Sequence, residues 1–341
     1  MEILLLHPGG LGDIILSLPA IALLRERSPA ARISIAGNID HLAPLTAGYA
    51  ERAIALSTLP LHRLYTPNPL PDGDVRFWKS FDRVVSWTGS GDSDFTRKLR
   101  DIHPDVIIAS WRPAPAEARH VSRLFVDSLR LGIPPETEVE PAQIHLSSTL
   151  RDAGTEWLGT HGWSARDSLI AIHPGAGSKT KRWPLANFVC LAQRLMRQKK
   201  SRLLIIEGPA ESELGREVAK ALSPAKVILV ESVTLSLLAA ILERCIAFVG
   251  NDSGLAHLAA GLGVPSVVLF GPTLPKHWAP LGRHVVALRD PRGCNACITG
   301  RGDHTCLGNI SVDEVRRSSA SLRRSARVSP IEINYRSVES V

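Results

Sequence analysis

Short apolar runs alternate with amphipathic stretches along most of the chain, and this alternation limits the possible folds more than any other feature of the sequence. Apolar runs separated by helix-length amphipathic segments are typical of parallel sheets with crossover helices. The expected strands of the first half are 2–7, 32–37, 52–56, 83–87 and 105–110, and its expected helices are 13–28 and 117–133. We therefore expect one α/β unit that ends near Ile133.

The same alternation starts again after a stretch at 134–167 that we interpret as a linker with one helix at 148–162. The expected strands of the second half are 168–177, 201–211, 226–232, 247–254 and 265–272, and its expected helices are 184–198, 212–222, 234–245 and 255–263. A chain of 341 residues is long enough for two domains of about 150 residues each. The predicted fold class is α/β, with two Rossmann-like doubly wound domains that face each other across a cleft. The expected domains are 1–150 and 151–328, followed by a basic and polar tail at 329–341.

Composition excludes several classes of protein. Hydrophobic residues make up 44% of the chain and charged residues 21%, which is typical of a globular protein. No apolar stretch reaches the length of about 18 residues that a membrane span needs, and the first ten residues do not resemble a secretory signal. The five cysteines, an odd number, fit a reducing compartment. We therefore expect a cytoplasmic protein.

The balance of charge favours anionic partners, because 40 basic and 33 acidic residues leave a formal charge of +7. Part of this excess lies in the segment 316–336, which contains six arginines, Arg316, Arg317, Arg323, Arg324, Arg327 and Arg336. An anionic membrane surface or a nucleic acid could bind such a segment. We favour a solvated terminal helix, and we expect no nucleic-acid partner.

The phrase HPGGLGD at 7–13 places a glycine-rich loop between the first expected strand and the first expected helix. Gly9, Gly10 and Gly12 could adopt positive φ angles and let another molecule approach the backbone. Asp13 stands where the helix would begin. It could cap the helix, or it could act chemically on a bound acceptor.

A second phrase, HPGAGSKTKRWP at 173–184, follows the first strand of the second half. The amides around Gly175 and Gly177, together with Lys179, Lys181 and Arg182, predict a site for an anion. The Trp-Pro pair that follows is expected to give a rigid entry to the next helix.

A third phrase, GNDSGLAH at 250–257, is typical of a capped helix start. Asp252 or Ser253 could cap a helix that begins near Gly254, and His257 would lie on its first turn. The amides of that turn could stabilise a diphosphate leaving group. The FGPT phrase at 270–273 is expected to line the same cleft.

Three further patterns leave alternatives open. Glu211 stands at the end of an expected strand and could accept hydrogen bonds from ribose hydroxyls, or it could be an exposed residue at a helix start. Cys294, Cys297, His304 and Cys306 could form a Cys₃His zinc site, but their spacing is unusual and we favour a loop of reduced cysteines. We interpret DGD at 72–74 and DSD at 92–94 as turns, rather than as metal-binding motifs of sugar-nucleotide enzymes.

Taken in order, five phrases make the chain resemble the bacterial lipopolysaccharide heptosyltransferases, glycosyltransferase family 9. They are GGLGDIILSLPAI, HPGAGSKTKRWP, GPAESE, GNDSGLAHLAAGLGVPSVVLFGPT and CNACITGRGDHTCLGNISVDEV. The resemblance spans nearly the whole chain and implies the two-domain GT-B fold, with an amino-terminal domain that binds the acceptor and a carboxyl-terminal domain that binds the donor.

The resemblance also implies a reaction, namely metal-independent, inverting transfer of heptose from ADP-heptose to a lipopolysaccharide core sugar. The general base of the family falls on Asp13, and Lys181 is the second catalytic residue. Glu211 would contact the nucleotide, while Asp252, Ser253, Gly254 and His257 would bind the diphosphate, with Gly175, Gly177 and Lys179 beside them. Gly9, Gly10 and Gly12 would lie against the acceptor. No cofactor or metal is expected, and peripheral contact with the inner membrane is expected to be weak.

Other functions remain as alternatives. The chain could use another nucleotide sugar in surface polysaccharide synthesis, or it could bind nucleotide sugars without catalysis. A nicotinamide-dependent dehydrogenase is disfavoured, because the glycine fingerprint would need a third glycine where Ile15 stands. A P-loop is also absent from the sequence.

Overall fold

The computed structural model describes residues 1–103, 105–114, 117–197, 200–208, 213–290, 292, 294 and 305–326. The chain divides into two compact units, Met1–His145 and Leu146–Val341. A boundary between residues 150 and 151 would fall inside helix α6 (Ser148–Thr160), which packs against α9 (Leu235–Glu243) in the second unit. The helix expected within the linker is therefore part of the second unit.

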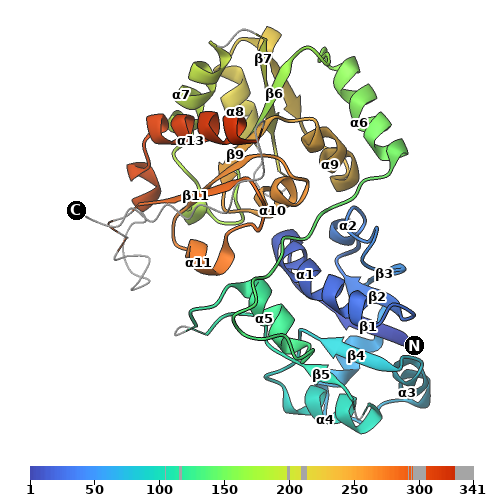
Figure 1. Ribbon diagram of the computed structural model, residues 1–341. Coiled ribbons are helices and arrows are strands. Elements are labelled where there is room, and N and C mark those ends of the chain that lie inside the picture. Colours follow the sequence, from blue (N-terminus) through green and yellow to red (C-terminus); the bar gives the residue numbers. More distant parts are fainter. Residues whose placement is uncertain are drawn as a thin grey trace. The chain divides into compact units, whose positions relative to one another are not determined.

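The first unit contains a parallel sheet of five strands in the order β3-β2-β1-β4-β5 (Figure 1). The strands are β1 (Glu2–Leu6), β2 (Arg32–Gly37), β3 (Arg52–Ala55), β4 (Arg83–Ser86) and β5 (Ile107–Ile108). In the central strand, Leu4 lies between Ser34 of β2 and Val84 of β4. Because the central strand is covered on both faces, its apolar residues form a continuous run rather than alternating with polar ones.

Helices cover both faces of this sheet. The helix α1 (Leu11–Arg27) packs against α5 (Val121–Ser128) and α2 (Ile39–Leu42). The other face is covered by α3 (Asp72–Lys79), α4 (Ser93–Ile102) and the 3₁₀ helix η2 (Pro60–Tyr65). There Trp78 of α3 and Phe95 of α4 pack with Leu4 and Leu6 of the central strand. The first unit is therefore a doubly wound layer structure, as predicted.

The second unit contains a parallel sheet of six strands in the order β11-β10-β9-β6-β7-β8. The strands are β6 (Ser168–His173), β7 (Ser201–Ile206), β8 (Val227–Val230), β9 (Ala247–Asn251), β10 (Ser266–Phe270) and β11 (Val285–Arg289). The strand β11 was not predicted from the sequence. The other five strands fall inside the expected ranges and end earlier, because the expected ranges included the loops that follow.

Two layers of helices also cover this second sheet (Figure 1). One layer contains α7 (Leu185–Met196), α8 (Leu214–Lys220) and α13 (Val312–Ser325). The other contains α6, α9 and α10 (Gly254–Gly261). The shorter elements are η1 (Leu56–Thr58) in the first unit and, in the second unit, η3 (Lys179–Lys181), η4 (Pro224–Lys226), α11 (Pro275–Trp278) and η5 (Cys306–Asn309). The prediction of two doubly wound α/β units is confirmed.

The strand order fixes where ligands can approach each sheet. In a doubly wound sheet the crevice opens at the carboxyl edge, between the two strands where the winding changes direction. That point lies between β1 and β4 in the first sheet, and between β6 and β9 in the second. The loop 7–10 follows β1, and the loops after His173 and Asn251 follow β6 and β9. The three glycine-containing phrases singled out in the sequence therefore lie at these switch points.

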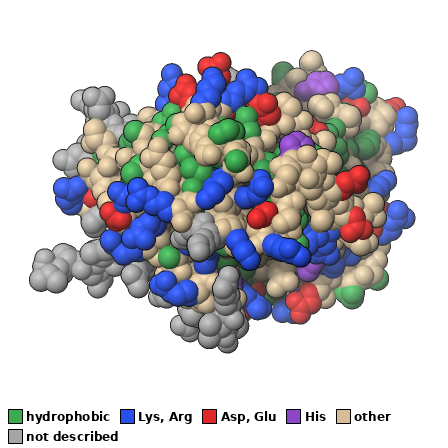
Figure 2. Space-filling view, turned by 90° about the horizontal axis from the view of Figure 1, so that it is seen from above, with side chains coloured by type: hydrophobic (Ala, Val, Ile, Leu, Met, Phe, Trp, Pro, Cys, Tyr) green, Lys and Arg blue, Asp and Glu red, His purple; other side chains and the backbone are tan. Residues whose placement is uncertain are grey.

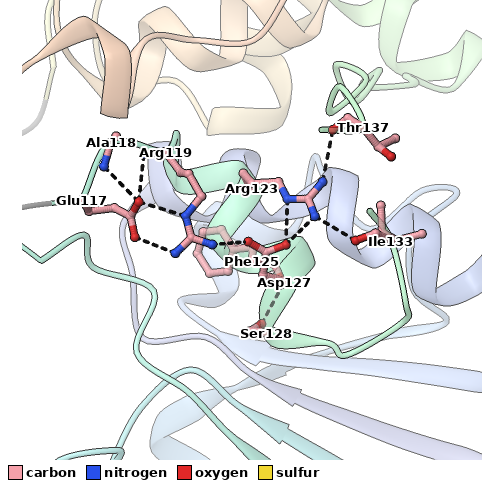
Figure 3. Close-up of polar contacts among 9 residues, drawn as sticks. All are labelled: Glu117, Ala118, Arg119, Arg123, Phe125, Asp127, Ser128, Ile133 and Thr137. Carbon is pink, nitrogen blue, oxygen red and sulfur yellow. Dashed lines mark hydrogen bonds and ion pairs between the residues drawn. The ribbon is translucent and has the colours of Figure 1, made fainter. Parts of the chain in front are cut away.

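A network of arginines and carboxylates holds α5 in place (Figure 3). The Asp127 carboxylate accepts hydrogen bonds from Arg119 and Arg123, and Glu117 accepts others from Arg119. Arg123, whose side chain is 7% exposed, also donates to the carbonyls of Ile133 at 2.9 Å and Thr137 at 3.1 Å. The segment that leaves α5 is thereby fastened to the helix.

The helix α13 is only partly what the sequence predicted. A terminal helix is present, but one face of it is not solvated, because Val315 is buried in the core of the second unit. Two basic side chains, Arg194 of α7 and Arg316 of α13, contact the same carboxylate, Asp313, at 2.7 and 3.5 Å. On the face seen in Figure 2, Lys and Arg side chains are interspersed with acidic and apolar ones. In the part of the chain that the structure describes, no helix has the length and apolar character to span a bilayer.

The interpretation of DGD and DSD as turns is wrong, because both phrases lie at the starts of helices. Asp72 is the first residue of α3, and Asp92 is the N-cap of α4, where its carboxylate accepts the Phe95 N–H at 2.8 Å. Carboxylates are favoured there, since they satisfy free amides and complement the positive end of the helix. Asp74 is held instead in an ion pair with Arg63 at 2.9 Å.

We predict opposite effects from two glycine-to-alanine substitutions in α6. A Cβ at Gly154 would lie 2.7 Å from the Cβ of Ala240 in α9, whereas a Cβ at Gly159 would meet nothing within 4 Å. Gly154→Ala is expected to lower the free energy of unfolding by about 1–3 kcal/mol, because the two helices would have to separate. Gly159→Ala is expected to raise it by about 0.5–1 kcal/mol, because alanine favours the helix. Urea unfolding of the two variants checks both signs, and a stabilising Gly154→Ala would show that α6 is not tightly packed.

Candidate functional site

The loop after β1 places Asp13 at the amino end of α1. Gly10 is the N-cap, with φ of −74° and ψ of −178°, and Asp13 is the third residue of the helix. The Asp13 carboxylate accepts the Gly10 N–H at 2.9 Å, so it does cap the helix. Its side chain is nevertheless partly exposed at the switch point of the first sheet. Capping and chemistry are therefore compatible at this position.

The expectation that the loop glycines use positive φ angles is wrong. Gly9, Gly10 and Gly12 are not among the described glycines with positive φ. Gly9 is needed for space instead, because a Cβ there would lie 2.5 Å from the Asp13 Cβ and 2.7 Å from His7 Cε1. Such distances are well inside van der Waals contact. The glycine therefore allows the loop to pass directly over His7 and against Asp13.

His7 forms the floor of this loop. It is fully buried, and its Nδ1 accepts the Gly9 N–H at 3.1 Å. Its ring contacts Trp87, Phe125 and Trp111, with centroids 5.4, 5.4 and 5.9 Å away. Burial in this aromatic pocket lowers the pKa of His7 from 6.5 to about 3. The imidazole is therefore neutral at physiological pH and remains a hydrogen-bond acceptor for the loop.

In the second unit, the structure brings together Lys181 and Asp252, which the sequence had assigned to one site. The Lys181 Nζ lies 2.7 Å from the Asp252 carboxylate, although the residues are 71 positions apart. Thr273, in the FGPT phrase, donates its hydroxyl hydrogen to the same carboxylate oxygen. Asp252 is 7% exposed at its side chain and Lys181 is 28% exposed. An ammonium group held by a buried carboxylate therefore reaches the surface at the switch point of the second sheet.

The start of α10 differs from the expectation in one respect. The N-cap is Ser253, and its side chain makes no capping hydrogen bond. Its hydroxyl lies 3.4 Å from Nδ1 of His173, a histidine whose pKa burial lowers from 6.5 to about 4. Asp252 does not cap the helix either, because it holds Lys181. Neither side chain therefore caps the first N–H groups of α10, which begins at Gly254, while the Ala256 N–H donates to the Ser253 carbonyl at 3.0 Å. His257 lies buried on that first turn, as predicted.

One residue that the sequence reading did not single out joins these segments. Asn251, the last residue of β9, is fully buried. Its Nδ2 donates to the carbonyls of Pro174 and Gly175 at 2.8 and 3.2 Å, and its Oδ1 accepts the Trp183 N–H at 2.9 Å. The sequence did contain a signal for this residue, because Asn251 is a polar residue at the end of the otherwise apolar strand β9.

The remaining predicted residues are placed as follows. Gly175 is buried, whereas Gly177 and Lys179 are exposed on the loop before Lys181. Glu211, Cys297 and His304 lie outside the described residues. Cys294 and Cys306 pack against each other and are buried. Among the residues that the structure describes, no group of three or more His, Cys, Asp or Glu side chains could hold a metal ion.

Comparisons with known proteins agree with the two-sheet architecture. The sequence model of glycosyltransferase family 9 (heptosyltransferase) matches residues 112–304. Lipopolysaccharide heptosyltransferase 2 of Salmonella typhimurium is 23% identical in an alignment 353 residues long, and the alignment covers 94% of this chain and 98% of that protein. The solved structure of a family 9 glycosyltransferase from Veillonella parvula is 22% identical, with a TM-score of 0.79 and coverage of 95% of this chain and 97% of that one. For E. coli ADP-heptose lipopolysaccharide heptosyltransferase II, the identity is 21%, the TM-score 0.73 and the coverage 95% and 99%. These structural likenesses confirm the fold class, which is of the GT-B type.

We predict that the burial of His7 makes the first unit sensitive to acid. Since the pKa is 6.5 when unfolded and about 3 when folded, the unfolded chain binds a proton between these values that the folded chain does not. The contribution of His7 to stability is therefore lost as the pH falls below about 6.5, by about 1.4 kcal/mol per pH unit within that window. In His7→Asn, which keeps a neutral acceptor, this dependence should be weaker. Urea unfolding between about pH 7 and pH 4 measures the slope, and His161→Asn, at an exposed histidine, serves as the control. Equal slopes in the wild type and His7→Asn would contradict the prediction.

Proposed function

We propose that this chain, which belongs to glycosyltransferase family 9, the heptosyltransferase family, transfers a heptose from ADP-heptose to a sugar of the lipopolysaccharide core. Membership makes the chain a glycosyltransferase. The observation that carries the proposal is the Lys181–Asp252 pair beside the start of α10, at the switch point of the second sheet. Positive charge and the amino end of a helix at that place suit a nucleoside diphosphate.

The donor would bind to the second unit. Its diphosphate would receive hydrogen bonds from the amides at Gly254 and charge compensation from Lys181, with Ser253, His257, Gly175, Gly177 and Lys179 nearby. These groups would stabilise the diphosphate most strongly when the bond to the sugar breaks and negative charge develops on it. Glu211, which lies outside the described residues, is kept as a candidate contact to the ribose.

Asp13 would be the general base in the first unit. The acceptor hydroxyl attacks the anomeric carbon from the face opposite the diphosphate, so a new C–O bond forms while the bond to the diphosphate breaks. ADP leaves with the bonding electrons, and the hydroxyl proton passes to the Asp13 carboxylate. This displacement inverts the anomeric carbon. Gly9, Gly10 and Gly12 would lie against the acceptor beside that carboxylate.

The proposal includes no metal, because Lys181 and the amides of α10 supply the positive charge that a divalent cation supplies to a leaving diphosphate in other enzymes. It also includes an acceptor that is itself anchored to the inner membrane, reached from the cytoplasmic side. Exposed Arg317 and Arg324 on α13 favour a weak contact with an anionic surface.

We expect Asp13→Asn to lower the transfer rate by about 10²–10⁴-fold, because an amide cannot take the proton. The Asn oxygen can still accept the Gly10 N–H, so the helix start should be preserved. The measurement is transfer from ADP-heptose to a core acceptor, together with calorimetric binding of ADP, which should not change.

Asp92→Asn is the matched control, because Asp92 also accepts an amide hydrogen at a helix start of the first unit. It should keep the wild-type rate. If Asp13→Asn retained full activity, Asp13 would have only a structural role. The assay is repeated with a chelator, and a fall in rate would contradict the metal-free part of the proposal.

Lys181→Ala is expected to weaken the binding of ADP by about 1.5–3 kcal/mol, the contribution of a charge-assisted hydrogen bond to phosphate. Part of any loss would come from leaving Asp252 without its partner beside the phosphate. The double variant Lys181→Ala/Asp252→Asn separates these effects, since it removes both charges and should recover part of the affinity.

Calorimetry of the wild type with ADP, UDP, GDP and NAD identifies the donor class in the same series. Preference for UDP or GDP would move the substrate to another nucleotide sugar, and binding of NAD alone would contradict a transferase donor site. If the protein binds ADP-heptose tightly but transfers no sugar to any core acceptor, it is a binding protein rather than an enzyme of this reaction.

A further inference from the structure

We infer that Asn251 is the positioning residue of the donor site, an inference that rests on the proposed function and deepens it. Its side chain uses both donors and one acceptor site on segments of the chain far from it in sequence. The two donors face carbonyls and the acceptor faces an N–H, so the orientation of the amide is settled by its partners. A fully buried amide with this set of bonds has no alternative partners in water.

Asn251 closes the base of the loop that carries Lys181. Pro174 and Gly175 stand at one end of this loop, and Trp183 stands at the other. Trp183 is itself anchored, because its Nε1 donates to the Ile310 carbonyl at 3.1 Å and its ring meets Phe188 edge to face. The loop 176–182 is thus tied to the core at both ends through one side chain.

The same bonds fix the direction of two amides. In a trans peptide the carbonyl and the next N–H point in opposite directions, and the described part of the chain has no cis peptides. Because the carbonyls of Pro174 and Gly175 point toward Asn251, the N–H groups of Gly175 and Ala176 point away from it. Asn251 therefore fixes the direction of both N–H groups, which lie on the side of the loop away from its side chain.

The next residue completes the arrangement. Asp252 holds the side chain of Lys181, while Asn251 holds the main chain of Trp183, two positions further along. Consecutive residues at the end of β9 therefore set both the backbone of the loop and the direction of its ammonium group. Asn251 does not need to touch the donor to act, because it acts through Gly175, Ala176 and Lys181.

The test uses two substitutions that remove the donors in different ways. Asn251→Asp keeps the shape and can still accept the Trp183 N–H, but its carboxylate would face two carbonyl oxygens. Burial raises the pKa of such a carboxyl, and the protonated form can donate one hydrogen bond. Asn251→Ala removes all three bonds at every pH. Ser266→Ala is the control, since it removes a buried hydrogen bond to Val264 at the opposite end of a neighbouring strand.

Binding of ADP to the full chain is measured at about pH 8 and about pH 6, each relative to the wild type. We expect Asn251→Asp to bind at least about tenfold more weakly at the higher pH and to recover part of this loss at the lower one. Asn251→Ala should be equally weak at both, and Ser266→Ala should bind normally. Wild-type affinity in both Asn251 variants would overturn the inference, and so would equal losses in Ser266→Ala.

A second readout needs no ligand and therefore separates this inference from the proposed function. Hydrogen exchange of peptides that cover 174–184 should be faster in both Asn251 variants, whereas peptides from β7 and α9 should be unchanged. If the wild type binds none of the nucleoside diphosphates, the proposed donor is wrong, and the exchange pattern alone decides whether Asn251 holds the loop. Unchanged exchange at 174–184, or equally fast exchange throughout the second unit, would overturn its positioning role.

Discussion

Peptide groups at the carboxyl ends of buried parallel strands must find hydrogen-bond partners without water, and the loops of both units depend on that requirement. In the first unit, the Gly9 N–H is satisfied by the buried His7. In the second, the carbonyls of Pro174 and Gly175 are satisfied by the buried Asn251. Leaving one such group unpaired costs about 1–3 kcal/mol. Each loop is therefore held in the conformation in which its partner can reach it.

The phrase HPG occurs in both units, yet the two histidines serve their loops differently. His7 accepts a backbone hydrogen directly, whereas Nδ1 of His173 lies near the hydroxyl of Ser253. Both are fully buried with lowered pKa values, so both imidazoles are neutral at physiological pH. The repeated phrase thus reflects a common position, the end of a central strand at the switch point.

The sequence predicted the fold well where hydrophobic pattern and burial agree. The run at 32–37 is β2 with the same bounds, and the switch-point loops follow the expected strands.

Prediction failed where one residue type serves two structures. Aspartates near glycine or serine suit turns and helix starts equally, so Asp72 and Asp92 were misread. The pairing of Lys181 with Asp252 was also missed, because a carboxylate before a helix can cap it or bind a cation, and only the three-dimensional contact separates the two. The glycine loop at 7–13 posed a similar problem. Glycine is selected both where φ is positive and where there is no space for a side chain, and at Gly9 the reason is space.

A carboxylate inside a proposed anion site looks unfavourable until its partners are considered. Asp252 accepts from both Lys181 and Thr273, so its charge is compensated before any ligand arrives. An excursion of Lys181 into solvent would leave the largely buried Asp252 carboxylate without its cationic partner, which disfavours that excursion. A lysine ammonium carries three donors, and one bond to Asp252 leaves the others for phosphate oxygens. The side chain has therefore already lost most of its rotamer freedom, about 2 kcal/mol for lysine, when the donor binds. On the proposed function, Asp252 thus favours donor binding by holding Lys181 in place, although its own charge would repel a phosphate.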